Sequence, residues 1–142
     1  MIKINSYKDI DGVCFGSGET DIASHFGEPV RRSVNREREA ELFFGNFILR
    51  LDADTGKLRE CTLLPECKGM INGHQVVWTE DFLQWLVSED ADLLEVFGYV
   101  VSLKLGVAVT GFHDRDESQK AIHAFRKGDW DMFRKRMNPF HL

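Results

Sequence analysis

The chain has 142 residues, of which 43% are hydrophobic and 11% aromatic, and its formal net charge is −5. This length and composition allow one domain with a filled core, which excludes a disordered polypeptide. The negative charge disfavours nucleic acid as the main ligand, and no apolar run approaches the ~20 residues of a membrane span.

The first half of the chain predicts one helix and a three-stranded meander. The helix is expected over residues 19–26, with Ser17 as a candidate cap. Gly45-Asn46 lies between two apolar runs and predicts a hairpin, because glycine accepts a positive φ. The turn residues 52–56 then lead into a third strand at 57–64.

The second half begins with the strongest short hairpin signal, Asn72-Gly73. A second helix is expected after Thr79, because Glu80 and Asp81 complement the positive end of a helix. Residues 96–112 are rich in Val, Leu, Tyr and Phe and predict one or two buried strands that turn at Gly106.

Two further helices are expected near the C-terminus, one from Asp116 to Gly128 and a short one from Trp130 to Met137. The predicted fold class is therefore α+β, with a mostly antiparallel sheet of a meander and hairpins packed with three to four helices. No internal repeat is evident, so we expect a single domain over residues 1–142.

The sequence offers no clear catalytic or metal-binding constellation. The histidines and cysteines lack zinc-ligand spacing, and Ser17, Ser102 and Cys14 lack the flanking residues of known nucleophile motifs. We therefore expect no enzyme activity, no metal and no cofactor. The titratable run from His113 to Asp116 leaves a small enzyme or ligand-binding domain as an alternative. All three cysteines, Cys14, Cys61 and Cys67, are expected to be reduced core residues.

Charge is distributed unevenly along the chain. No lysine or arginine occurs between Lys68 and Lys104, a stretch that carries six acids. Six bases follow between Ser118 and the C-terminus, near aromatic residues, and we interpret them as the solvated face of a helix rather than a nucleic-acid surface. A surface of one charge sign can steer a basic protein partner toward it.

The chain resembles small bacterial immunity proteins, the cytoplasmic antidotes to polymorphic or secretion-delivered toxins, such as those of type VI secretion. The resemblance lies in the opening run from Gly12 to Gly18, the run from His25 to Pro29, the meander, the run from Ser102 to Val109, and the closing run from Gln119 to Ile122. It implies a cytoplasmic protein that binds one cognate toxin and blocks its active site.

On charge alone, we expect the toxin to bind the acidic stretch, with a nearby exposed tryptophan, Trp78 or Trp85, as the anchor. A scaffold domain that forms a homodimer is the other alternative, in which the acidic surface only confers solubility. The candidate partner-binding residues are Glu80, Asp81, Trp85, Glu89, Asp90, Asp92 and Glu95.

Overall fold

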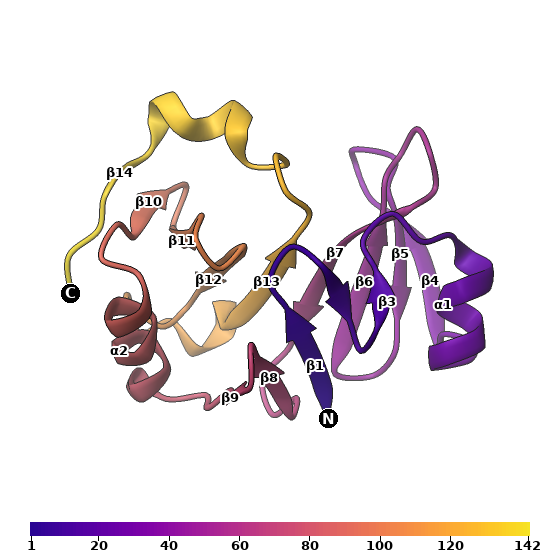
Figure 1. The fold of residues 1–142 in the computed structure, drawn as a ribbon, viewed down its shortest axis with the longest axis horizontal. Coiled ribbons are helices and arrows are strands. Elements are labelled where there is room, and N and C mark those ends of the chain that lie inside the picture. The colour runs from indigo at the N-terminus through magenta and orange to yellow at the C-terminus, as the bar shows by residue number, and fades with distance from the viewer.

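The computed structural model describes all residues, 1–142, as two β-sheets with two α-helices and two short 3₁₀ helices (Figure 1). A five-stranded sheet has the order β3-β2-β1-β8-β9, and a nine-stranded sheet has the order β14-β10-β11-β12-β13-β7-β6-β5-β4. All strand pairs are antiparallel except β1 with β8. The elements in chain order are β1 (Ile2–Asn5), β2 (Asp9–Ile10), β3 (Val13–Cys14), α1 (Glu19–Phe26), β4 (Arg31–Val34), β5 (Ala40–Phe43), β6 (Phe47–Leu51), β7 (Leu58–Leu63), β8 (Gly69–Ile71), β9 (His74–Gln75), α2 (Glu80–Glu89), β10 (Leu94–Val96), β11 (Tyr99–Ser102), β12 (Val107–Thr110), η1 (Glu117–Gln119), β13 (Ala121–Phe125), η2 (Asp131–Arg136) and β14 (Asn138–Pro139).

The chain contains an internal structural repeat, contrary to the expectation from sequence. Helix α1 is followed by the meander β4–β7, and helix α2 is followed by the meander β10–β13. The last strands of the two meanders, β7 and β13, pair antiparallel, so both repeats share one continuous sheet. Figure 1 shows these strands in the middle of the molecule, with α1 and α2 at opposite ends.

The repeat extends to the hairpin that precedes each helix. Asp11 and Gly12 link β2 to β3 with φ values of 53° and 84°, and Asn72 and Gly73 link β8 to β9 with φ values of 48° and 84°. These left-handed pairs are the geometry of a type I′ turn, which Asp, Asn and Gly adopt most readily. The two halves therefore share the order of their elements and the geometry of their turns, while few residues are identical between them.

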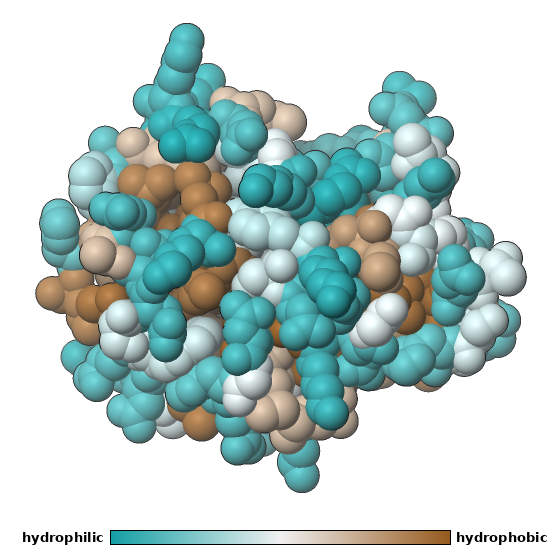
Figure 2. All heavy atoms as spheres, viewed as in Figure 1, coloured by the Kyte–Doolittle hydropathy of each residue, from teal (hydrophilic) through white to brown (hydrophobic).

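The main hydrophobic core lies between the nine-stranded sheet and a layer formed by the two helices and the smaller sheet. Its side chains come from alternate residues of the strands, as in the neighbouring pairs Leu49 with Cys61 and Cys61 with Ala124. On the other face of the sheet, Val101, Ala108 and Phe125 form a second cluster. Figure 2 shows hydrophobic atoms over β10–β12, beside the C-terminal segment, and mostly hydrophilic atoms over the rest of this face.

The antiparallel character, the first two helices and the hairpins at Gly45, Asn72 and Gly106 are confirmed. The expected helix from Asp116 to Gly128 is wrong. It is a single 3₁₀ turn, η1, followed by strand β13. In β13, Ile122 and Ala124 point to the main core and Phe125 to the second cluster, so this segment is buried on two faces, which obscures a strand's alternation. The expected fourth helix is the 3₁₀ helix η2.

Two smaller expectations are also corrected. The cap of α1 is Gly18 rather than Ser17, and no side chain bonds to the helix N-terminus there. Cys61 and Cys67 are buried, but Cys14 is exposed, because β3 is an edge strand of the smaller sheet.

Candidate functional site

A groove runs along the outer side of helix α2. It consists of two separate hollows of about 220 Å³ and 270 Å³, both lined by Leu142, and we call them together the α2 groove. The residues that line it come from α2, from the turn between α2 and β10, from the loop after β12 and from the C-terminus: Glu80, Leu83, Gln84, Val87, Asp90, Ala91, Leu93, Phe112, His113, Arg115, Phe140, His141 and Leu142.

The sequence of α2 explains why this side of the helix faces the groove. Phe82 and Leu86 are fully buried in the core, whereas Glu80, Gln84 and Val87 follow one another at helical spacing on the exposed side. The C-terminal segment forms the opposite wall, because β14 pairs with β10 and the Phe140 N–H donates to the Leu93 carbonyl over 2.8 Å.

The loop between β12 and β13 is fastened to the start of α2. Arg115 Nε lies 3.2 Å from Glu80 Oε1, and Lys120 Nζ donates to the Trp78 carbonyl over 2.9 Å. Asp116 accepts a hydrogen bond from the Ser118 N–H and so caps η1, as expected for an Asp at this position. These contacts bring the loop's acidic residues to the mouth of the groove.

The structure gathers an acidic cluster that sequence spacing did not reveal. Five exposed carboxylates lie in the first turn of α2 and in the loop that is fastened to it. Two of them have cationic partners, because Glu80 pairs with the exposed Arg115 and Glu117 pairs with the buried Lys120. Sequence analysis missed the loop members because some thirty residues separate them from α2, and only the return of the chain through β10–β12 places them there. We call this cluster the α2 acidic end: Glu80, Asp81, Asp114, Asp116 and Glu117.

The remaining predicted acids do not form one surface with this cluster. Glu89, Asp92 and Glu95 are exposed. Lys104 Nζ donates to the Glu89 carbonyl over 2.6 Å, and Glu95 pairs in register with Asn138, close in sequence to Arg136. Residues 69–103, which contain no lysine or arginine, therefore lie next to basic residues from other parts of the chain in the folded protein.

Asp90 is a correction to the predicted surface. It is only 5% exposed, and its carboxylate accepts hydrogen bonds from the Ser102 hydroxyl at 2.7 Å and from the Asp92 N–H at 2.8 Å. Asp90 therefore joins the end of α2 to strand β11 and has no free oxygen directed at a partner.

The tryptophans expected as exposed anchors are half-buried. Trp85 stacks on His74 with 4.2 Å between ring centroids and 4° between planes. Trp78 donates from Nε1 to the Cys67 carbonyl over 3.0 Å and stacks on Phe112. Both rings therefore hold local structure together, and the large exposed apolar residues at the groove are Val87 and Leu142.

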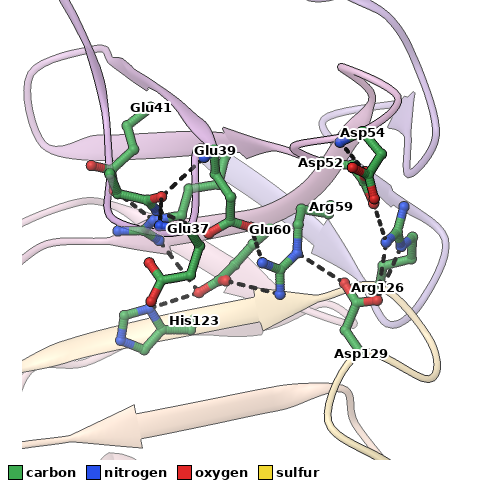
Figure 3. Close-up of polar contacts among 12 residues, drawn as sticks. Glu37, Glu39, Glu41, Asp52, Asp54, Arg59, Glu60, His123, Arg126 and Asp129 are labelled. Atoms are coloured by element: carbon green, nitrogen blue, oxygen red, sulfur yellow. Dashed lines mark hydrogen bonds and ion pairs between the residues drawn. The ribbon is translucent and has the colours of Figure 1, made fainter.

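A second polar cluster lies on the sheet face opposite the main core, where the two repeats meet (Figure 3). Arg50 Nε lies 2.7 Å from Glu41, and Arg59 contacts Glu39 and lies 3.1 Å from Asp129. Each charged side chain in it has a partner of opposite charge, so the network offers no unpaired charged group for binding, and removal of one member would leave its partner with less compensation. Its members are Glu39, Glu41, Arg50, Asp52, Arg59, Glu60, Thr62, His123, Arg126 and Asp129.

The network shifts the pKa of two of its carboxyl groups. Burial would raise the pKa of Glu60, but the hydrogen bond from His123 and the charges of His123, Arg50 and Arg59 outweigh burial and lower it. The hydrogen bond from Arg126, with those from the backbone of residues 54 and 55, lowers the pKa of Asp52 to about 2.

No group of three or more His, Cys, Asp or Glu side chains is arranged to hold a metal ion. No helix is both long enough and apolar enough to cross a membrane. Comparison with known proteins assigns no family: no family model matches the sequence, and no curated protein or solved structure matches it.

Proposed function

We propose that this protein acts by binding a basic protein partner through the α2 groove and the α2 acidic end, and that it catalyses no reaction itself. The observation that carries the proposal is the gathering of five exposed carboxylates, with one exposed cation, in the two segments that meet beside a partly apolar groove, which Glu80 and Arg115 line. The resemblance to immunity proteins makes the expected partner a cytoplasmic toxin, such as a basic nuclease, whose active site is covered on binding.

Physical chemistry assigns different tasks to the two parts of this site. The exposed carboxylates raise the rate at which a basic partner reaches the surface, because charges of one sign steer diffusional encounter. The groove takes an apolar side chain of the partner, and such desolvated anchors dominate affinity at most interfaces. The two separate hollows, of about 220 Å³ and 270 Å³, are each smaller than the roughly 300–1,000 Å³ typical of small-molecule pockets, which favours partner side chains over a metabolite.

One observation favours small-molecule binding as the second candidate. His113 lines the groove, and its Nδ1 atom is buried without a hydrogen-bond partner. A buried polar atom of this kind is uncommon in folded proteins and can serve a ligand. If the wild type binds a metabolite saturably and the variant His113→Phe does not, small-molecule binding is supported over binding of a protein partner.

The experiment compares two triple variants with the wild type. The test variant reverses Glu80, Asp81 and Asp114 to lysine, and the control variant reverses Glu37, Asp54 and Glu66, three exposed acids outside the α2 acidic end. Each protein captures partners from its source cell, and the captured protein is then co-expressed with each variant in a growth assay.

The expected result is that the wild type and the control variant bind the same basic protein and protect the cell from it, whereas the test variant does neither. The proposal is wrong if the test variant captures and protects as well as the control. Equal melting temperatures of the two variants show that the difference is one of binding and not of folding.

A further inference from the structure

The two outer edges of the nine-stranded sheet differ, although the internal repeat makes them equivalent. At one edge, β14 pairs with β10, the first strand of the second meander. At the other edge, β4 is the first strand of the first meander, and no strand pairs with its outer side. Figure 1 shows the C-terminal segment beside β10 and nothing corresponding to it beside β4.

The residues just before these two strands show the consequence. Leu93, before β10, is 3% exposed, and the adjoining segment carries Phe140, which packs against the main core. Val30, before β4, is 80% exposed, and Val34 at the end of the strand is 67% exposed. An apolar surface that the C-terminal segment covers in the second repeat is therefore open in the first.

A pocket occurs beside this open edge. It has a volume of about 110 Å³ and lies between α1 and the strands β4 and β5, the equivalent of the space beside α2 that Phe140 lines. Its lining includes the apolar side chains of Ile22, Leu42 and Phe44 and the charged side chains of Glu19, Glu28 and Arg32.

The backbone of β4 can receive another strand. The Asn35 N–H donates to the Glu39 carbonyl over 3.0 Å, so Asn35 belongs to the residues whose backbone groups face β5. Hydrogen-bonding direction alternates along an antiparallel strand, which directs the N–H and C=O groups of Arg32 and Val34 to the open side. Such free groups are a template for strand addition.

The charges at this edge specify the chemistry of the added strand. Four exposed arginines lie in or just after β4, and they outnumber the three exposed acids beside them, Glu19, Glu28 and Glu37. The arginines are Arg31, Arg32, Arg36 and Arg38. Of these four, Arg32 has a carboxylate partner, Glu19 of α1, while Arg31 lies over the ring of Phe43. A second copy of β4 would place arginines opposite one another, which is destabilising, whereas an acidic segment would complement them.

We propose that the β4 edge and the pocket beside α1 bind an extended acidic segment of a partner protein. The segment adds as an antiparallel strand outside β4, as β14 does outside β10. One of its apolar side chains enters the pocket beside α1, and its carboxylates face the arginines. This surface lies at the opposite end of the molecule from the α2 groove, so it does not depend on the function proposed above.

The test uses synthetic peptides and the complete protein. The probe is an eight-residue peptide of alternating Glu and Val, with acetylated and amidated ends. One control peptide replaces Glu by Lys, and a second carries N-methyl groups on alternate residues, which remove the donors that strand addition needs. Binding is followed by amide chemical shifts in NMR and by hydrogen exchange.

We expect the acidic peptide to shift the amide signals of β4 and to protect those of Arg32 and Val34 from exchange, with at least tenfold weaker binding of both control peptides. The variant Arg31→Glu/Arg36→Glu should weaken binding tenfold or more, while Lys8→Glu/Lys68→Glu, a reversal of two exposed bases outside this edge, should not. Shifts away from β4, equal binding of the Lys peptide, or a concentration-dependent dimer through β4 would overturn the proposal.

Discussion

Glu60 Oε1 lies 3.1 Å from His123 Nδ1 at the place where the two repeats are joined. The same His123 atom lies 2.8 Å from the hydroxyl of Thr62, which also receives a hydrogen bond from Arg50. Side chains from β6, β7 and β13 thus form one partly buried polar cluster. This cluster lies beside the backbone hydrogen bonds that join the three strands. The junction therefore combines a backbone ladder with charge pairing, and both repeats depend on it.

Replacing Glu60 by glutamine should destabilise the protein. The change removes the charge that His123, Arg50 and Arg59 share, while Arg50 keeps Glu41 and Arg59 keeps Glu39 and Asp129, so we expect a loss of about 1.5–3 kcal/mol. Urea unfolding followed by circular dichroism measures this loss. The exposed Glu37→Gln is the matched control, and a loss below 1 kcal/mol for Glu60→Gln would contradict the assigned role.

Stability should fall in acid partly because of Asp52. Its pKa is lowered from 3.8 to about 2 in the folded protein, so its ionised form stabilises the fold above the unfolded-state pKa, and this contribution is lost as pH falls through about 2. We expect Asp52→Asn to be less stable than the wild type at pH 6 and to lose less stability between pH 4 and pH 2. Parallel pH profiles for the two proteins would rule out this linkage.

Gly111 should be much less replaceable than Gly45, although both have a positive φ. A Cβ atom on Gly111 would lie 2.6 Å from backbone atoms of Asp116 and Lys120, whereas one on Gly45 would meet nothing within 4 Å. Gly45→Ala therefore isolates the backbone strain of about 1–2 kcal/mol, and Gly111→Ala adds a steric clash in the loop of the α2 acidic end. Melting temperatures measure the difference, and equal values would contradict it.

One cysteine per chain should react rapidly with a thiol reagent. Cys14 is exposed, while burial raises the pKa of Cys61 and of Cys67 and removes them from solvent. At pH 8, Ellman's reagent should detect one fast thiol in the native protein and three after unfolding. The variant Cys14→Ser should show no fast phase; a remaining fast thiol would mean that a buried cysteine becomes accessible.

Reversing Glu80 and Asp81 should slow association with a basic partner at low salt, and the difference from the wild type should shrink as salt is raised, because screening removes steering. The melting temperature should fall only slightly. The reversal removes the exposed Glu80–Arg115 pair and two acids that favour the N-terminus of α2, and both effects are small at a solvated surface. Surface plasmon resonance against the captured partner measures the rates. Identical association rates at low salt would remove the α2 acidic end from the binding mechanism.

Local signals in the sequence determined much of the fold. Asn72-Gly73 and Gly45 specify turns through their own φ preferences, and the acids after Thr79 mark a helix start, so these elements are visible without tertiary information. The segment 121–125 was predicted wrongly because its apolar residues face two cores, and burial on both faces removes the alternation by which a strand is recognised.

Only the tertiary structure decided which residues act together. The internal repeat is held by equivalent turns and strand pairing rather than by shared residues, and the α2 acidic end joins helix residues to a loop more than thirty positions later. The burial of Asp90 could not be predicted from the sequence either, because the Ser102 hydroxyl that donates to its carboxylate belongs to strand β11. A sequence records the sign and order of its charges, but the field that a partner meets depends on the distances between them, and those distances are set by the path that the chain takes through strands β10–β12.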